Sequence, residues 1–414
     1  MSIEIITFGC RLNSYESSII KQNAKKHGIK NIIIINTCSV TQEAEKKAYY
    51  TIKKIKRKFP YKKIIVTGCS VQINPHQYHR MNEIDFIYGN KEKINSKIFD
   101  NLVNRKEKII VNNIVSIQNK NYEMIEKFQN RSRAFIQIQN GCNHKCTFCI
   151  IPLGRGLNRS IPIESIIKYT KKMIGIGYKE IVLTGVDITD YGYDIYKKMT
   201  LGNMLKILLK KIPNIKRLRL SSIDASEVND ELLEVIINEK KIMPYVHLSL
   251  QSGDDIILKR MKRRHKRYQI IQLQKKIREL RPEIVFGADI IAGFPTENEE
   301  MFNNTYNILL EMPIIHAHIF PYSIRKNTPA SRMPQVKKSI IKNRAIILRK
   351  TANQLLSSYL QSKIGSIQKV LVEKNSYGLT EDFCKVKVPE NLKCGEIYNL
   401  RINNATKNCL NVIN

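Results

Sequence analysis

The sequence has no long hydrophobic run. No aliphatic run is longer than Ile32–Ile35, whereas a helix that crosses a bilayer needs about 20 apolar residues. The segment MSIEIITFGC also lacks the basic stretch and the apolar core of a secretory signal. We therefore expect no membrane anchor and a cytoplasmic protein. Tryptophan is absent too, which excludes no class of function.

Acidic residues are scarce relative to basic ones. The 414 residues include 36 Asp and Glu against 70 Lys and Arg, a formal net charge of +34. This charge favours a polyanionic partner, nucleic acid before an anionic membrane surface. The high content of Ile, Lys and Asn is also typical of AT-rich genomes, but this codon bias does not explain the twofold excess of Lys and Arg over Asp and Glu. With 43% hydrophobic residues, the chain is neither disordered nor a disulfide-stapled miniprotein.

The nine cysteines are clustered rather than spread evenly. In a reducing cytosol, clustered cysteines indicate metal binding or catalysis rather than disulfides. They stand at positions 10, 38, 69, 142, 146, 149, 384, 394 and 409.

The first ~70 residues repeat a strand–helix pattern three times. Three aliphatic stretches (IEIITF, NIIIINT and KKIIVTG) alternate with helical stretches at residues 13–27 and 41–59. This alternation is typical of βαβ units around a parallel sheet. Cys10, Cys38 and Cys69 each follow one of these strands. Because ligands of open α/β sheets bind at the carboxyl ends of the strands, we predict a shared metal site there.

A second alternation of strands and helices continues to about residue 330. It predicts a parallel barrel that falls short of the usual eight strands. A helix is expected over residues 335–361, and short alternating strands then predict a small all-β domain, as in many RNA-binding modules. We expect Cys384, Cys394 and Cys409 there to be ordinary small apolar residues. The predicted barrel strands are Ala134–Gln139, Glu180–Thr184, Lys216–Ser221, Tyr245–Gln251, Ile284–Ala292 and His316–Tyr322. The predicted segments are 1–110, a polar linker at 111–130, 131–358 and 359–414.

The densest cysteine group, Cys142-Asn-His-Lys-Cys146-Thr-Phe-Cys149, follows the first predicted barrel strand. Thiolates bind zinc or iron–sulfur clusters. Ordinary clusters use four cysteines, so three would leave one iron open to a substrate or cofactor. Zinc with His144 as the fourth ligand is the alternative, although only one residue separates His144 from Cys142 and from Cys146.

The CxxxCxxC spacing resembles the radical S-adenosylmethionine (SAM) superfamily. The resemblance implies a [4Fe–4S] cluster on Cys142, Cys146 and Cys149 whose open iron binds SAM, which is cleaved to a 5′-deoxyadenosyl radical. It also implies SAM contacts from the ends of barrel strands, although the glycines there could be turn residues. The residues that we assign to SAM binding are Thr184, Gly185, Asp187, Ser221, Gln251 and Gly293.

Both ends of the chain narrow the resemblance to the methylthiotransferases. The segments around Cys10, Cys38 and Cys69 are similar to that family's N-terminal domain, which implies a second [4Fe–4S] cluster on these residues. Residues 378–381 and 395–396 resemble its TRAM domain, an RNA-binding β-barrel. The implied fold is an N-terminal parallel α/β domain, a central partial (β/α)6 radical SAM barrel and a C-terminal all-β TRAM barrel.

Three segments resemble the branch that modifies threonylcarbamoyladenosine in tRNA: residues 218–224, 258–265 and 328–335. Residues 153–155 and 324–327 depart from its pattern. The resemblance implies insertion of a methylthio group at C2 of N6-threonylcarbamoyladenosine-37, with the anticodon stem-loop, an electron donor and a sulfur source as partners. The C2–H bond is not acidic, so we expect no side-chain acid or base. The alternatives are isopentenyladenosine-37, a ribosomal-protein aspartate, or a noncatalytic RNA-binding iron–sulfur protein.

The basic stretch at residues 259–267 contains seven Lys and Arg. We expect contacts to RNA phosphates, which position RNA without reading its sequence; a solvated helix start is the alternative. Tyr191 and Tyr193 could stack on a base or simply pack. The predicted RNA-binding residues are Arg155, Arg159, Arg260, Lys262, Arg263 and Arg264.

Overall fold

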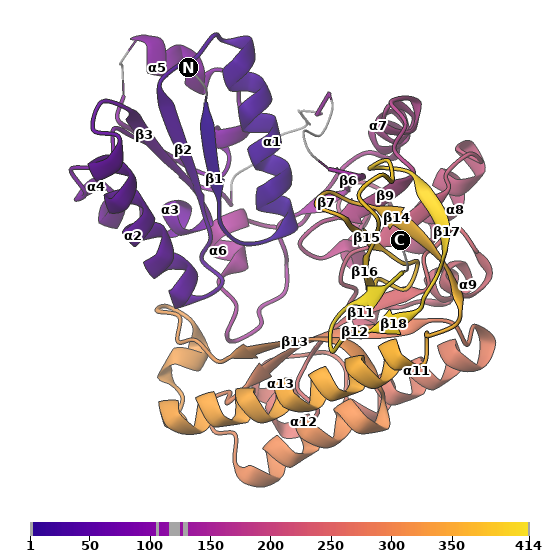
Figure 1. Ribbon diagram of the computed structural model, residues 1–414. Helices are drawn as coiled ribbons and strands as arrows, with labels where there is room; N and C mark the ends of the chain where they lie inside the picture. Colours follow the sequence, from indigo (N-terminus) through magenta and orange to yellow (C-terminus); the bar gives the residue numbers. More distant parts are fainter. Residues whose placement is uncertain (1–2, 105–106, 116–124, 127–130, 413–414) are drawn as a thin grey trace.

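The N-terminal part is a five-stranded parallel sheet between helices (Figure 1). The computed structural model describes residues 3–104, 107–115, 125–126 and 131–412. The strands lie in chain order: β1 (Glu4–Thr7), β2 (Ile32–Thr37), β3 (Lys63–Gly68), β4 (Phe86–Tyr88) and β5 (Ile109–Ile110). The helices are α1 (Arg11–Lys26), α2 (Gln42–Lys58), α3 (Cys69–Ile73), α4 (Pro75–His79) and α5 (Ile98–Asn104).

The uninterrupted aliphatic strands explain this arrangement. Every residue of β2 is buried, as expected for a strand covered on both faces. Ile34 faces the α1 side, where it joins a core with Ile20, and Ile35 faces the α2 side with Ile52. The predicted parallel sheet is therefore confirmed.

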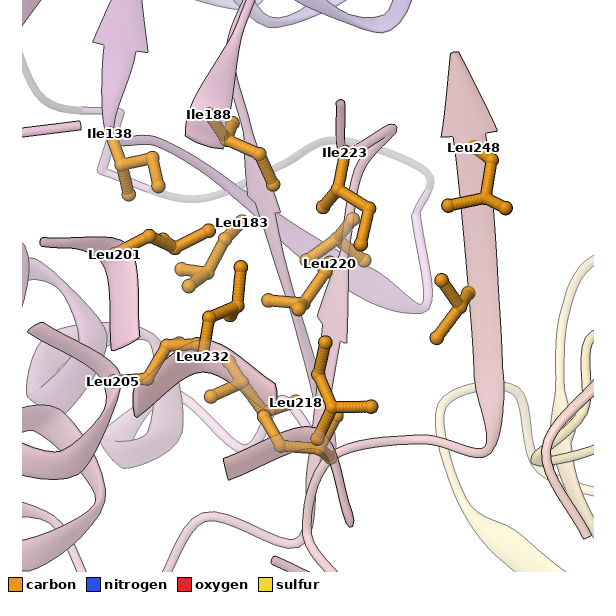
Figure 2. Packing of buried hydrophobic residues seen from close by; sticks show 14 of the residues in the cluster. Ile138, Leu183, Ile188, Leu201, Leu205, Leu218, Leu220, Ile223, Leu232 and Leu248 are labelled. Atoms are coloured by element: carbon orange, nitrogen blue, oxygen red, sulfur yellow. The ribbon is translucent and has the colours of Figure 1, made fainter. Parts of the chain in front are cut away.

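The central part is an open barrel of six parallel strands. Its two halves, β6–β9–β10 and β11–β12–β13, meet where Ile223 N–H donates to the His247 carbonyl at 2.9 Å. The strands are β6 (Arg133–Gln137), β9 (Glu180–Thr184), β10 (Arg217–Leu220), β11 (Tyr245–Gln251), β12 (Val285–Ala292) and β13 (Ile314–Pro321). The covering helices are α7 (Ile163–Gly175), α8 (Leu201–Lys211), α9 (Asp230–Asn238), α11 (Arg267–Leu280) and α12 (Glu299–Glu311). Figure 2 shows the apolar layer between strands and helices, with Leu205 and Leu232 against Leu218 and Leu220.

The C-terminal part is a six-stranded, mostly antiparallel sheet that follows the long helix α13 (Lys338–Gln361). Its core joins Leu360 of α13 to Val370, Val386 and Ile402. Cys384 and Cys409 are buried there as predicted, but Cys394 is exposed. The strands are β14 (Ile367–Val372), β15 (Tyr377–Leu379), β16 (Lys385–Lys387), β17 (Ile397–Arg401), β18 (Asn404–Ala405) and β19 (Leu410–Asn411).

The turn between β15 and β16 closes the amino-terminal end of the barrel. Phe383 stacks on Tyr245, the first residue of β11, with 5.1 Å between ring centroids. The Phe383 ring also lies 4.9 Å from the guanidinium carbon of Arg219, which is ion-paired with Glu180 at 2.9 Å. The C-terminal sheet is thus packed into the barrel rather than tethered beside it.

The three sheets fall within the predicted segments 1–110, 131–358 and 359–414, whose boundaries we retain as a proposal. Most of the predicted linker at 111–130 lies outside the described residues. Across the described residues, no helix is long and apolar enough to cross a membrane.

Candidate active site

The three N-terminal cysteines lie at one edge of the parallel sheet. Cys10 precedes α1, Cys38 follows β2 and Cys69 begins α3. Gly9 has a φ of +94°, and a Cβ atom there would lie 2.5 Å from the Cys38 sulfur. A glycine is therefore required for the loop of Cys10 to approach Cys38 this closely.

Two sulfur atoms of this trio each accept a hydrogen bond from a nitrogen donor. The Val40 N–H donates to the Cys38 sulfur at 3.4 Å, and Asn90 Nδ2 donates to the Cys69 sulfur at 3.4 Å. Such hydrogen bonds favour the thiolate form that a metal centre needs. They also belong to the interactions that tune iron–sulfur clusters.

The second cysteine trio occupies the loop at the carboxyl end of the barrel. Cys142 follows β7 (Gln139–Asn140), and Cys149 precedes α6 (Ile151–Arg155). The His144 N–H donates to the Cys142 sulfur at 3.4 Å. Arg263 Nη1 donates to the Cys146 sulfur at 3.5 Å. This trio therefore also combines thiol groups with fixed donors.

The spacing of the sulfurs distinguishes a cluster from a single zinc ion. Ligands of tetrahedral zinc lie about 2.3 Å from the metal, so their sulfurs lie about 4 Å apart. Among the described residues, neither trio forms a group of ligand atoms that all lie within 4.8 Å of one another. The three sulfurs of each trio are therefore not spaced as ligands of one zinc ion, although Cys142, His144 and Asp187 do lie within that distance of one another. The residue types of each trio suit a [4Fe–4S] cluster.

Burial makes these thiols depend on a metal centre. Burial raises the pKa of Cys38 to about 11 and that of Cys149 to about 12. A buried thiolate without a compensating charge is unfavourable, and bound iron supplies that charge. Cys38 and Cys149 thus have the chemistry of cluster ligands rather than of reactive surface thiols.

The two trios meet across α6. A Cβ atom on Gly154 would lie 3.2 Å from Cys69 Cβ, so α6, which follows Cys149, rests directly on the N-terminal trio. A cavity of about 240 Å³ opens beside this contact. Residues of both parts line it, including Val40 and Thr41 after Cys38, and Cys149, Gln251 and Asp289 of the barrel.

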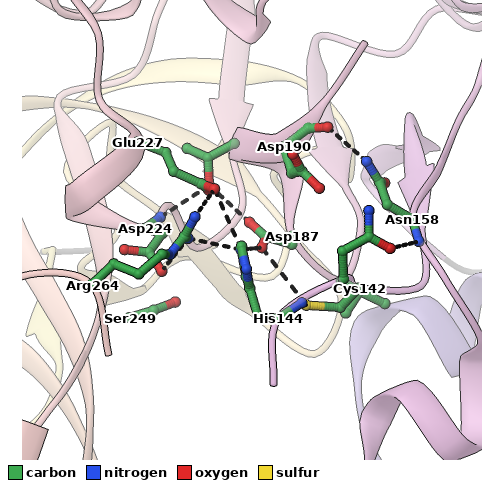
Figure 3. Close-up of polar contacts among 12 residues, drawn as sticks. Cys142, His144, Asn158, Asp187, Asp190, Asp224, Glu227, Ser249 and Arg264 are labelled. Atoms are coloured by element: carbon green, nitrogen blue, oxygen red, sulfur yellow. Dashed lines mark hydrogen bonds and ion pairs between the residues drawn. The ribbon is translucent and has the colours of Figure 1, made fainter. Parts of the chain in front are cut away.

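A polar network borders the barrel trio (Figure 3). His144 Nε2 lies 2.7 Å from Asp187 and 3.3 Å from Glu227. Hydrogen bonds to these two carboxylates raise the pKa of His144 to about 10. The imidazole is therefore committed to carboxylates, which argues against His144 as a zinc ligand. Asp187 in turn lies 3.8 Å from the Cys142 sulfur.

The side chain of Gln139 holds the loop after β9. Its Oε1 atom accepts from the N–H groups of Val186 and Asp187, both at 2.9 Å. A Cβ atom on Gly185 would lie 2.8 Å from the same oxygen, so the glycine permits this approach. Two of the predicted SAM-binding residues, Gly185 and Asp187, thus lie beside the barrel trio.

The other predicted SAM contacts divide into two groups. Gln251 lines the cavity, with a φ of +68°, and Thr184 is buried at the end of β9. Ser221 instead donates its hydroxyl to the Leu183 carbonyl at 2.8 Å. Gly293 faces α13, where a Cβ atom would lie 2.6 Å from Ile341. The missing side chain of Gly293 therefore serves packing rather than the cavity.

The prediction that Arg155 contacts RNA is wrong. Its side chain is 3% exposed and donates to Glu16 at 2.9 and 3.1 Å and to Asn13 at 2.6 Å. Although burial opposes ionisation, the charges of Arg155 and Lys93 lower the pKa of Glu16 to about 2. These contacts tie α1, which follows Cys10, to α6, which follows Cys149.

Arg263 is a second correction. Its side chain is 8% exposed and donates to Asp224 at 2.7 Å as well as to Cys146. Although burial acts in the opposite direction, His265 and Arg263 hold the pKa of Asp224 well below its usual range. The side chain of Arg263 is therefore used in contacts with Asp224 and with Cys146 of the cluster loop and not in an RNA-binding surface. Tyr191 is fully buried and cannot stack on a base, whereas Tyr193 is exposed.

The remaining predicted RNA-binding residues stay at or near the surface. Lys262 is exposed, and Arg264 is 41% exposed although it pairs with Glu227 at 2.5 Å. Arg260 donates to the Thr296 hydroxyl at 2.7 Å, and Arg159 donates to the Arg155 carbonyl at 2.8 Å.

Several site residues escaped the sequence analysis. Arg325 of the loop after β13 binds Glu45 of α2 at 2.7 Å and the carbonyl of Ser39, which joins barrel and N-terminal sheet beside Cys38. Lys93 lies 2.5 Å from Glu16. Their partners are distant in sequence, so no local motif marks them.

Comparison with known proteins agrees with this geometry. Residues 136–309 match the model of the radical SAM superfamily, and residues 2–89 match the model described as uncharacterized protein family UPF0004. Threonylcarbamoyladenosine tRNA methylthiotransferase MtaB of Rickettsia prowazekii is 50% identical, over 95% of this chain and 93% of that protein. The protein of the same name from Aquifex aeolicus is 36% identical, over 94% of this chain and 96% of that protein.

More distant relatives share the scaffold. The tRNA-2-methylthio-N(6)-dimethylallyladenosine synthase of Clostridium botulinum (strain Loch Maree) is 34% identical, over 90% of this chain and 86% of that protein. Among solved structures, the radical SAM methyltransferase TsrM of Kitasatospora setae has a TM-score of 0.58 at 11% identity, covering 80% of this chain and 74% of that chain. The last likeness supports the fold alone.

Proposed function

This chain belongs to the radical SAM methylthiotransferase family, and we propose that it adds a methylthio group to C2 of N6-threonylcarbamoyladenosine-37 in tRNA. The observation that carries the proposal is the contact of α6, which follows Cys149, with Cys69, beside a cavity that Cys149 lines together with Val40 and Thr41 after Cys38. The 50% identical relative is named for this substrate.

The proposed cluster ligands divide by domain. Cys142, Cys146 and Cys149 would hold the SAM-binding [4Fe–4S] cluster, and Cys10, Cys38 and Cys69 the auxiliary one. When bound, these cofactors supply the radical and the sulfur chemistry that no side chain can supply at an unactivated C–H bond. The protein's own contribution is to bind and orient: Asp187 and Gln251 border the barrel trio, and α6 fixes the distance between the two trios.

The excess of basic residues supports an RNA substrate. We propose that exposed lysines such as Lys262 contact the anticodon stem-loop together with the C-terminal sheet. The reaction further requires an electron donor and a sulfur source as partners, and tRNA as substrate implies a cytoplasmic enzyme.

Nucleoside mass spectrometry tests the substrate. Anaerobically reconstituted protein with SAM and reductant should convert a stem-loop with threonylcarbamoyladenosine-37 to its 2-methylthio form and release 5′-deoxyadenosine. The isopentenyladenosine stem-loop is the competing substrate, because a 34% identical relative is named for the dimethylallyl nucleoside. Conversion of only that stem-loop would refute the proposed substrate, and failure to cleave SAM would refute the enzyme class.

A further inference from the structure

Halfway down the barrel, two imidazoles share one carboxylate oxygen. His247 Nε2 and His318 Nδ1 each lie 3.1 Å from Asp289 Oδ1. Asp289 and His318 are register partners on β12 and β13, and His247 comes from β11. The three side chains therefore converge inside the barrel from neighbouring strands.

Neighbouring side chains hold His247 of this cluster in place. The Tyr245 hydroxyl lies 2.7 Å from His247 Nδ1, and Phe383 stacks on the Tyr245 ring. A Cβ atom on Gly287 would lie 2.3 Å from the Tyr245 hydroxyl and 2.7 Å from His247 Nδ1. The glycine thus leaves the space that the tyrosine–histidine pair occupies, and His247 is only 7% exposed.

The hydrogen bonds determine what the cluster presents to the cavity. A carboxylate accepts, so both imidazole nitrogens that face Asp289 Oδ1 carry protons, and His247 Nδ1 accepts from Tyr245. With its ring nitrogens used in this way, the cluster favours hydrogen bonding over metal binding. The groups left for a ligand are the second oxygen of Asp289, which lines the cavity with Cys149, and the acceptor Nε2 of His318, whose side chain is 53% exposed next to Asp289 but is not itself part of the cavity lining.

We propose that Asp289 and His318 bind the polar substituent on N6 of the target adenosine. This inference rests on the proposed function. In adenine, one ring nitrogen separates C2 from C6, the carbon that bears N6. A cavity that brings C2 to the clusters therefore also receives the start of the N6 substituent.

The chemistry of a threonylcarbamoyl group matches the cluster. Its ureido N–H can donate to Asp289, and its hydroxyl can donate to Nε2 of His318, which is the unprotonated nitrogen of that ring. An isopentenyl group offers neither donor nor acceptor. Leaving the buried polar groups of a site unpaired is costly, so such a site discriminates strongly against the apolar analogue.

The test measures binding without reductant, so that it does not depend on turnover. Full-length reconstituted protein is titrated with three stem-loops that carry threonylcarbamoyladenosine, isopentenyladenosine or adenosine at position 37. Wild-type protein should bind the first at least about 10-fold more tightly than the third. In His318→Phe that ratio should fall to about 3-fold or less, with the affinity for the adenosine stem-loop unchanged.

Two further variants complete the test. Tyr245→Phe, which frees His247 without touching the cavity, should lower the same ratio by a smaller factor. His79→Asn, on the exposed face of α4, is the matched control and should leave it unchanged. SAM cleavage to 5′-deoxyadenosine without RNA should stay within about 2-fold of wild type in His79→Asn, which shows that the control variant keeps an intact SAM site.

The failures are distinguishable. If wild-type protein makes no 2-methylthio product from the threonylcarbamoyl stem-loop, the proposed function fails. If it makes the product but shows no binding preference, or His318→Phe retains the preference, only the role of the cluster fails. An equal loss for all three stem-loops, loss of SAM cleavage, or loss of a bound divalent ion in His318→Phe would also overturn it. Should His318→Phe not fold, the ratio in Asp289→Asn decides, with the same expected loss.

Discussion

Replacing Glu16 by glutamine should strongly lower the free energy of unfolding. Glu16 lies in a junction where α1, α6 and the segment after β4 meet, and it is the counter-charge of both Arg155 and Lys93. The three side chains are 4%, 3% and 1% exposed. Glu16→Gln keeps the shape but leaves two buried cations without an anion.

Two routes give the same magnitude for this change. Removing one partner of a buried ion pair costs about 3–5 kcal/mol. Independently, the fall of the Glu16 pKa from 4.5 to about 2 corresponds to about 3 kcal/mol of stability at neutral pH. Because denaturation slopes rise with chain length above the roughly 1–3 kcal/mol per molar urea of small proteins, the midpoint should fall by roughly 0.5–1 M.

Urea unfolding of apo protein, followed by circular dichroism at pH 7, measures this shift. Glu126→Gln is the matched control, because Glu126 also pairs with a lysine, Lys26 at 2.7 Å, but at the surface. Exposed pairs contribute little, so its midpoint should not move. A Glu16→Gln midpoint within about 0.3 M of wild type would refute the reasoning. So would a failure of the apolar triple variant Glu16→Leu, Lys93→Met, Arg155→Met to recover most of the loss.

The pH dependence of stability provides an internal check. The folded-state pKa of Glu16 lies below its unfolded value, so its stabilisation is complete above about pH 4.5 and is lost as the pH falls toward 2. Between about pH 4.5 and 2, the free energy of unfolding of the wild-type protein should fall by about 3 kcal/mol more than that of Glu16→Gln. The variant has no titrating group at position 16.

Three other predictions concern the clusters, the RNA, and the packing of Phe383 against the amino-terminal end of the barrel. Cys146→Ala should reduce reconstituted iron from about eight to about four atoms per chain and abolish SAM cleavage, whereas Cys394→Ala at the surface should change neither, as iron analysis and product chromatography would show. Lys262→Gln and Lys266→Gln should each lower the salt dependence of tRNA binding by roughly one phosphate contact in anisotropy titrations at several salt concentrations; an unchanged slope would place the RNA elsewhere. Phe383→Ala should destabilise the docked C-terminal sheet by up to about 3 kcal/mol, measured as faster proteolytic release of residues 359–414, and a wild-type cleavage rate would contradict the role of its ring.

The sequence predicted the scaffold well because the signals were local. Aliphatic runs bounded by glycine and polar residues identified β2 (Ile32–Thr37) and β9 (Glu180–Thr184), and parallel-sheet geometry placed Cys10, Cys38 and Cys69 at one edge. The CxxxCxxC spacing similarly located the barrel trio. These features depend on a few neighbouring residues and can therefore be read from the sequence alone.

The cluster of His247, Asp289 and His318 was not predicted, because it forms only through the register in which the barrel strands pair. The three residues are far apart in sequence, and each is a polar residue in a largely apolar strand with no motif around it. Only the pairing of β12 with β13, which sets Asp289 opposite His318, brings them together. The signal that could have pointed to them was their position on the inward face of predicted strands, two residues from Tyr245 in the case of His247.

The arginines show why net charge predicts a partner but not the residues that bind it. Arg155 pairs with Glu16 across 139 positions, and Arg219 pairs with Glu180 inside the barrel. Each such pair removes one acid and one base from the surface and leaves the excess of +34 unchanged. Because Asp and Glu number only 36, every acid buried in this way raises the ratio of basic to acidic groups on what remains exposed. The buried arginines therefore strengthen the electrostatic case for RNA while transferring the contacts to exposed lysines, of which Lys262 is the predicted example.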